Sequence, residues 1–246
     1  MTKNKITKIN YMGEASWVLG VVLVALGVCL CKKADLGVSM IAAPAFIIYE
    51  AVATLWSGFS VGMVEYIIQG ILLILLCLTV RRFNVRYILC FVVAIIYGYV
   101  LDFWLFVLSP EPFTAVYVRW IMFFIGDVIT ATGVAFFFRT YMPLQIYELF
   151  VAEVADKYRL PINKTKFFYD LGSFVLSAIL AFTLFGDAKS FQWNNILTTS
   201  YHSIGLGTVI TSFINAPIIS ASGKLMDKVF NYQPVFRKFS AFLMKK

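Results

Sequence analysis

The chain has 246 residues, of which 61% are hydrophobic and 14% are charged, and its formal net charge is +8. Soluble domains contain about 45–50% apolar and about 25% charged residues, so this composition excludes an ordinary soluble domain. The basic excess is typical of a membrane protein with Lys- and Arg-rich cytoplasmic loops, and no nucleic-acid partner is expected.

Apolar residues fall in six long blocks, which predict six transmembrane helices. A hydrocarbon core about 30 Å thick needs about 20 mostly apolar residues in a helix, whereas β-barrel spans show a short apolar–polar alternation. The predicted fold class is therefore all-α, a polytopic transmembrane helix bundle that forms a single membrane domain over residues 1–246. The predicted spans cover about 14–33, 60–80, 86–108, 116–138, 166–186 and 202–223.

Two further segments are apolar but too short or too interrupted to be assigned as spans. Residues 36–56 contain Pro44 and Glu50, and residues 142–160 are apolar only from Pro143 to Ala152. A proline removes a helix hydrogen bond, and a buried carboxyl is costly inside a bilayer. Both segments are predicted to be short or re-entrant.

Charge counting favours a topology in which neither segment crosses and both termini are cytoplasmic. Lys and Arg accumulate on the cytoplasmic side, and this topology places 17 of the 21 basic residues there. If both segments cross, the best split is 14 against 7. If only residues 36–56 cross and the N-terminus is outside, the split is 16 against 5. The predicted location is the inner membrane of a bacterium.

The two halves of the chain, about 14–108 and about 116–230, resemble each other. Each has a Gly-Val pair near the end of its first span, at Gly27 and at Gly133, followed by a basic residue, a helix breaker and a short segment. Each half also closes with a Gly-x-x-x-Asp sequence. Three crossings in each half would invert the second copy, and inverted repeats are the architecture of many secondary transporters.

Several motifs resemble those of the YczE/YyaS/YitT-type bacterial membrane proteins. The first reads Ala-Asp-Leu-Gly-Val-Ser, similar to the AxLGxSP-like signature of that group, although Met40 replaces the proline. A later one is similar to its GIGT…GP element, with Ala216 in place of the glycine that precedes the proline. The resemblance implies a multi-span inner-membrane protein of a kind that is commonly labelled a permease. The matching segments are residues 34–39, 142–145, 204–210 and 215–217.

Acidic residues within the predicted spans are candidate pathway residues. A charge at a helix centre costs roughly 2.5–3.5 kcal/mol on insertion scales, so such side chains face a cavity or a partner. Asp127 lies deepest and has no Lys or Arg nearby, which favours a neutral, proton-coupling carboxyl; a hydrogen bond to a neighbouring helix is the alternative. Glu65 and Asp170 each head a polar stripe, and Asp102 shares a helix face with Gly98.

Polar residues in the last span and in the first short segment are further candidates. Thr208, Thr211 and Asn215 fall on one helix face. Pro217 then predicts an interrupted helix, typical of the substrate-lining helices of transporters. An interface of small residues between helices is the alternative. Ser39 is predicted to cap a helix whose free N–H groups point at a ligand.

Together these features predict a small-molecule permease, coupled to protons through Asp127 or through the Glu65–Asp170 pair. A channel, or a non-transporting subunit or solute-binding partner of another system, is the alternative. An enzyme is not expected, because the sequence has no GxSxG, no HExxH and no Cys/His pair. No metal or cofactor site is predicted, and the four cysteines are assigned to packing. The expected partners are the bilayer, a small molecule and, in a homo-oligomer, a second copy.

Overall fold

Eight α-helices make up most of the regular structure of the residues that are described. The computed structural model describes residues 9–56, 58–109, 113–186, 197–236 and 240–241. Six of the helices in this part of the chain are long and apolar enough to cross a membrane, which confirms the predicted all-α transmembrane bundle. These six are α1 (Gly13–Ala34), α3 (Val61–Val80), α4 (Arg86–Leu108), α5 (Val116–Phe137), α7 (Ile162–Phe185) and α8 (Leu206–Val229).

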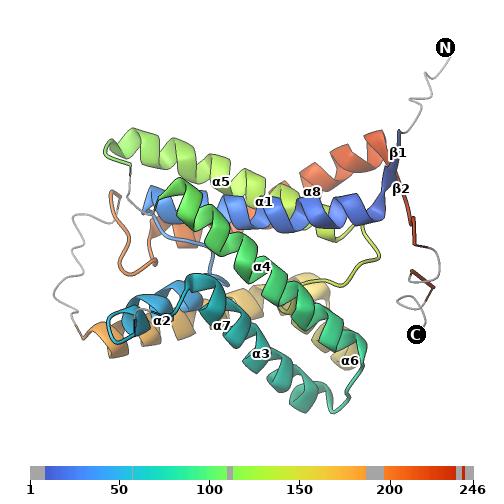
Figure 1. The fold of residues 1–246 in the computed structure, drawn as a ribbon, viewed down its shortest axis with the longest axis horizontal. Coiled ribbons are helices and arrows are strands. Elements are labelled where there is room, and N and C mark those ends of the chain that lie inside the picture. Colours follow the sequence, from blue (N-terminus) through green and yellow to red (C-terminus); the bar gives the residue numbers. More distant parts are fainter. Residues whose placement is uncertain (1–8, 57, 110–112, 187–196, 237–239, 242–246) are drawn as a thin grey trace.

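The two segments of uncertain topology form short helices, α2 (Ala43–Ala53) and α6 (Ile146–Tyr158). At about 1.5 Å per residue they are roughly 16 Å and roughly 20 Å long, too short for a hydrocarbon core of about 30 Å. Figure 1 shows α2 and α6 at opposite ends of the molecule. The prediction that both segments are short is therefore confirmed, and six crossings remain.

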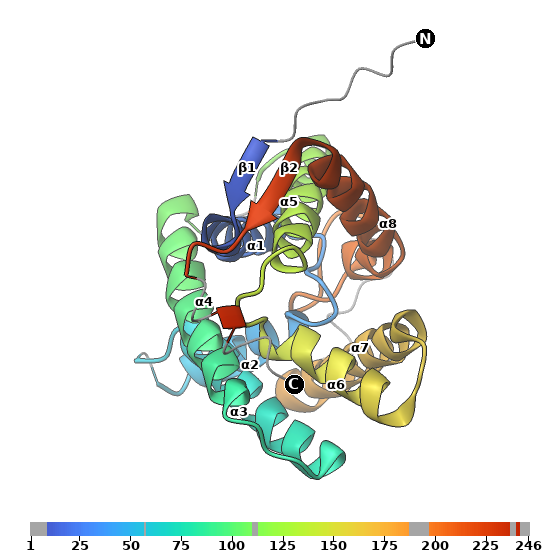
Figure 2. The ribbon, with the colours of Figure 1, turned by 90° about the vertical axis from the view of Figure 1, so that its right-hand side faces the viewer.

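Glycines allow α1 and α5 to pack backbone to backbone at the centre of the bundle. A Cβ added at Gly20 would lie 3.1 Å from the carbonyl oxygen of Gly133, and one added at Gly126 would lie 2.9 Å from that of Gly27. Small residues permit such close approach in membrane helices. In Figures 1 and 2, α1 and α5 lie side by side with α8 next to α5, and α4 crosses towards α3.

The chain leading into α2 is held by the loop before α8. The N–H of Gly207 donates to the carbonyl oxygen of Leu36 at 2.8 Å, and the N–H of Val38 donates to that of Ser203 at 3.0 Å. Gly37 has φ +108°, and a Cβ there would lie 2.7 Å from the amide nitrogen of Gly205. Two of the motifs that carry the family resemblance thus bind each other, and their glycines let the two backbones cross.

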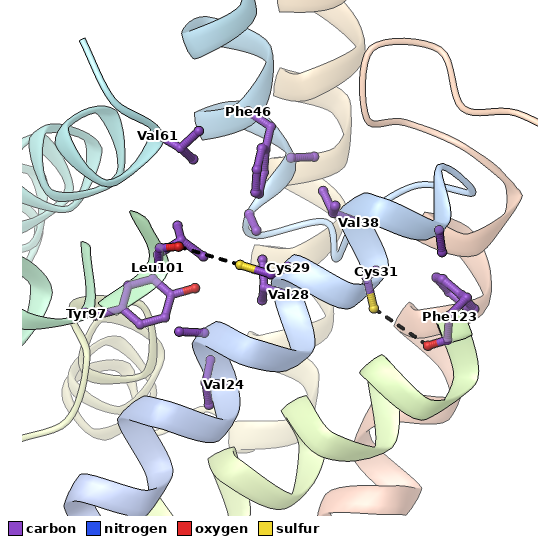
Figure 3. Packing of buried hydrophobic residues seen from close by; sticks show 14 of the residues in the cluster. Val24, Val28, Cys29, Cys31, Val38, Phe46, Val61, Tyr97, Leu101 and Phe123 are labelled. Atoms are coloured by element: carbon purple, nitrogen blue, oxygen red, sulfur yellow. Dashed lines mark hydrogen bonds between the residues drawn. The ribbon is translucent and has the colours of Figure 1, made fainter. Parts of the chain in front are cut away.

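Buried side chains from α1, α2, α3, α4 and α5 form the main apolar core, shown in Figure 3. Two of the four free cysteines lie in this core. The thiol of Cys29 donates to the carbonyl oxygen of Leu101 at 3.6 Å, and that of Cys31 donates to Phe123 at 3.7 Å. These contacts agree with a packing role for the cysteines.

The chain ends that the structure describes lie at one end of the bundle. Strand β1 (Ile9–Met12) pairs in parallel with β2 (Phe230–Gln233), so both lie on the same side of the bundle, as an even number of crossings requires. We call this the strand end of the molecule. At the same end, Arg139 makes a two-pronged ion pair with Asp227, with both N–O distances 2.7 Å.

Three local predictions about helix limits are wrong. Ser39 does not cap α2, which begins at Ala43; its carbonyl oxygen, not its hydroxyl, accepts the N–H groups of the turn before the helix. Pro217 does not interrupt α8, which runs through it, because a helix tolerates the loss of one hydrogen bond when its turns pack elsewhere. The last span starts at Leu206, not at residue 202, because His202 and Ser203 have positive φ angles.

Candidate functional site

A cavity of about 430 Å³ lies in the middle of the bundle. Residues 39–42, which lead into α2, line it on one side, and the start of α6 (Gln145, Tyr147 and Glu148) lines it on the other. The long helices contribute residues from their middle turns, such as Val28 of α1. The two short helices, which occupy opposite ends of the molecule, therefore both begin at this cavity.

Three carboxyl groups and one ammonium group line the cavity. The carboxyls belong to Glu65, Glu148 and Asp170, and the ammonium belongs to Lys166. Lys166 lies one turn before Asp170 on α7, with 3.4 Å between its Nζ and the nearer carboxylate oxygen. Burial raises the pKa of Glu148, although the nearby Lys166 opposes this effect. If all four groups were ionised, the cavity would carry an excess of negative charge.

Two side chains of α3 hold the start of α6 in place. The carboxyl of Glu65, which is only 1% exposed, accepts a hydrogen bond of 2.7 Å from the hydroxyl of Tyr147. Gln69 accepts one of 3.3 Å from the N–H of Ile146, at the first turn of α6. Burial, together with the nearby Glu65 carboxyl, raises the pKa of Tyr147 well above its ordinary value, so the phenol keeps its proton and donates.

Three buried polar atoms of cavity residues have no hydrogen-bond partner among the described residues. They are Nε2 of Gln145, Oε2 of Glu148 and Oδ1 of Asn215. Buried polar atoms in folded proteins are nearly always paired, with protein, water or a ligand. The three residues come from α8 and from the start of α6, and all three line the cavity.

The rest of the lining is mostly apolar. It includes Phe167, Leu171 and Phe174 from α7 and Phe213 and Ile219 from α8. A concave site lined by apolar side chains with a few polar groups is the usual form of a small-molecule site.

The comparison with protein families gives one match, to a family of unknown function called DUF6198, over residues 13–224. The chain belongs to the DUF6198 family. No match was found among curated proteins or among solved structures. The DUF6198 match includes all of the cavity lining, from Val24 to Ile219.

The structure brings five of the eight predicted site residues of this DUF6198 chain to the cavity. Glu65 and Asp170 contribute carboxyl groups, Ser39 lies on the approach to α2, and Thr211 and Asn215 lie on α8. The polar face predicted for the last span is therefore turned towards the cavity along part of its length.

The other three predicted residues lie outside the cavity lining. Thr208 is fully buried and bonds the backbone of the loop before α8. Asp102 accepts hydrogen bonds from the hydroxyl of Ser60 at 2.6 Å and from the N–H of Gly62 at 2.8 Å, so it joins α4 to the start of α3. Asp127 is buried on α5, but it does not line the cavity.

Several polar residues of the cavity were not predicted from the sequence, among them Gln145, Tyr147, Glu148 and Lys166. Gln145, Tyr147 and Glu148 belong to the segment that is too short to cross, and Lys166 lies at the start of a span. The signal was present, since Glu148 is an acid in an otherwise apolar stretch from Pro143 to Ala152. Its depth in the bundle depends on α6 starting near the centre, which no local pattern reveals.

A second polar cluster lies at the end of the molecule opposite the strand end. Glu50 of α2 contacts the ammonium of Lys32 at 2.6 Å and Nδ1 of His202 at 2.8 Å. Burial alone would raise the pKa of Glu50, but Lys32 and His202 hold it below its ordinary value. His202 also stacks on Phe185, with 3.6 Å between ring centroids, so the cluster ties α2 to α1 and to the ends of α7 and α8. Among the described residues, no group of His, Cys, Asp and Glu is arranged to hold a metal ion.

Proposed function

We propose that this membrane protein is a small-molecule permease, and that its substrate binds in the central cavity. The observation that carries the proposal is the meeting of two short helices and three carboxyl groups, of which that of Glu65 is buried, at one cavity in the middle of the bundle. Secondary transporters bind their substrates near the bilayer midplane, where discontinuous helices begin. The motif resemblance to YczE/YyaS/YitT-type proteins supports the same proposal.

The proposed coupling group is Glu65, with Asp170 as the second carboxyl of the cavity. A carboxyl buried as deeply as that of Glu65 needs either a proton or a cation beside it. Among the described residues, the hydroxyl of Tyr147 donates a hydrogen bond to this carboxyl, and it can do so whether the carboxyl is protonated or ionised. A group that holds a proton or a solute cation, but not both at once, links the movement of one to the movement of the other.

An inverted repeat is part of the proposal. Three contacts recur when each helix is exchanged for its mate in the other half: α1 packs on α4 as α5 packs on α8, α2 on α7 as α6 on α3, and α2 on α3 as α6 on α7. The glycines where α1 crosses α5 follow the same symmetry. Gly20 corresponds to Gly126 and Gly27 corresponds to Gly133, and the members of each pair are 106 residues apart. A two-fold axis in the membrane plane accounts for these pairs.

We place the strand end on the cytoplasmic side of a bacterial inner membrane. Most basic residues of the described helix ends and loops lie there, and the opposite end has only Lys32, Lys33 and Arg119. Lys and Arg accumulate on the cytoplasmic side of inner-membrane proteins.

A cysteine at Asn215 should react with a water-soluble thiol reagent if the cavity is a solute pathway. The chain for this test has its four native cysteines replaced by alanine. Asn215→Cys, reconstituted in liposomes, is treated with a membrane-impermeant cationic methanethiosulfonate, and the mass of the intact protein is measured. We expect one added label, because Asn215 lines the cavity.

Ile71→Cys in the same background is the matched control. Ile71 lies in the middle of α3, is 62% exposed and does not line the cavity, so lipid surrounds it. We expect no label at this position. An Asn215→Cys protein that reacts no better than the Ile71→Cys protein would exclude a water-accessible pathway and with it the proposed function.

A further inference from the structure

The cavity opens sideways between α7 and α8. Three residues that line it there, Phe167, Leu171 and Phe213, are 52%, 41% and 68% exposed. On the other side of the bundle, α3 and α4 are in tight contact, where a Cβ added at Gly98 would lie 2.7 Å from the carbonyl oxygen of Gly62. Figure 2 shows α7 and α8 well apart, with α3 and α4 close together.

This opening faces the hydrocarbon of a bilayer. Both α7 and α8 are membrane spans; Leu171 and Phe213 lie within them, and Phe167 lies near the start of α7. The exposed side chains at its edge are apolar, as those of Phe167, Leu171 and Phe213 are. A molecule that entered by this route would come from the lipid phase. It would therefore need an apolar part in order to partition into the bilayer.

The cavity joins apolar and charged surfaces. Most side chains of α7 and α8 at the opening are apolar, and the Lys166–Asp170 pair of α7 also lines the cavity, while Glu65, Glu148 and Gln145 line it on α3 and α6. Within the described residues, Oε2 of Glu148 is buried without a partner. An acceptor of this kind is complementary to a positively charged donor, because buried carboxylates are otherwise paired.

We infer that the cavity takes amphipathic organic cations from the bilayer through the opening between α7 and α8, with the cationic head beside Glu148 and the apolar body along the rim. This inference rests on the proposed function and names its substrate class. The three carboxyls outnumber the one ammonium of the cavity, so a cation lowers the excess negative charge that a neutral or anionic amphiphile leaves in place.

Photolabelling tests the inference directly. The full chain in lipid nanodiscs is irradiated with a long-chain alkylamine that carries a diazirine, and the labelled peptides are identified by mass spectrometry. We expect labels on Phe167–Phe174 and Val209–Ile219, at the edges of the opening. Dodecylamine should compete for the label, and dodecanol, which has the same chain and no charge, should not.

Two variants of opposite charge effect make the test specific. In the Glu148→Gln protein, the concentration of dodecylamine that halves the labelling should rise at least about tenfold, because removing one partner of a buried charge pair is costly. Lys166→Gln removes a positive charge from the same cavity and should lower that concentration or leave it unchanged. Elution of each variant from a gel-filtration column as a single species shows that the variant is folded.

Labels spread evenly over lipid-facing helices, equal competition by dodecanol, or an unchanged Glu148→Gln protein would each overturn the inference. Absence of label at α7 and α8 would also overturn it, and would point to a second copy of the chain covering the opening. If labelling fails while Asn215→Cys still reacts with the water-soluble reagent, only the substrate class and its route are lost. If Asn215→Cys is unreactive, the proposed function itself is lost.

Discussion

Replacing Gly27 with alanine will prevent α1 and α5 from packing, and we expect little folded protein to be recovered. The new Cβ would lie 2.5 Å from the carbonyl oxygen of Gly126 and 2.6 Å from the amide nitrogen of Thr130. Backbone atoms cannot move aside as a side chain does, so the helices must separate. Overpacking costs about 1–3 kcal/mol even where side chains yield, and here the central pair of the bundle is affected. The measurement is the thermal midpoint of the detergent-purified protein.

Gly172→Ala is the matched control for this variant. Gly172 lies in the middle of α7, and a Cβ there would meet nothing within 4 Å. Alanine in place of glycine within a helix is favourable by roughly 0.5–1 kcal/mol, so the midpoint should stay the same or rise slightly. A Gly27→Ala protein as stable as the Gly172→Ala protein would show that α1 and α5 do not approach as closely as described.

From the proposed function we expect Glu65→Gln to abolish transport driven by a pH gradient. The change keeps the size of the side chain and an acceptor for the hydroxyl of Tyr147, but it removes the carboxyl that we propose exchanges a proton for a cation. Proteoliposomes loaded with an acidic buffer are diluted into a neutral buffer with ethidium, an amphipathic cation, and uptake is followed by fluorescence. We expect the unmodified chain to accumulate ethidium and the Glu65→Gln protein to show no more uptake than empty liposomes.

Two further variants separate the carboxyl from its surroundings. Tyr147→Phe removes one hydrogen bond, worth about 1 kcal/mol, and should slow uptake only a few-fold. Asp127→Asn changes a buried acid outside the cavity lining and should leave pH-driven uptake unchanged. If Asp127→Asn stops uptake and Glu65→Gln does not, the coupling site lies on α5 and the assignment of Glu65 is wrong.

The spans were predictable because a membrane constrains sequence strongly. Backbone groups inside a bilayer must bond within their own segment, so a charge-free apolar run of sufficient length is a helix. The runs from Ile67 to Val80 and from Leu171 to Gly186 lie within α3 and at the end of α7, as expected. The shortness of α6 was predictable in the same way, since its segment is apolar only from Pro143 to Ala152. Residues 36–56 are apolar enough that the sequence left a crossing open, and only Pro44, Glu50 and the charge count favoured a short segment.

The site was only partly predictable, because the position of a residue along its helix does not determine which neighbouring helices or cavities its side chain faces. Asp127 is buried in the middle of α5, yet the cavity lies beside the neighbouring Thr130 and Val134 instead. Glu148 belongs to a helix too short to cross, and it reaches the cavity only because α6 begins near the centre. These placements depend on the packing of α6 against α3 and α7, which involves residues far apart in sequence.

We propose that a solute passes through the cavity between the two short helices, and blocking the cavity is the sharpest test of this proposal. Ethidium uptake is measured in proteoliposomes of the Asn215→Cys protein before and after complete reaction with the thiol reagent. The Ile71→Cys protein, forced to react in detergent before reconstitution, is the control. The account predicts that the label at Asn215→Cys stops uptake and that the label at Ile71→Cys does not. Uptake that continues unchanged through a fully labelled Asn215→Cys protein would contradict it.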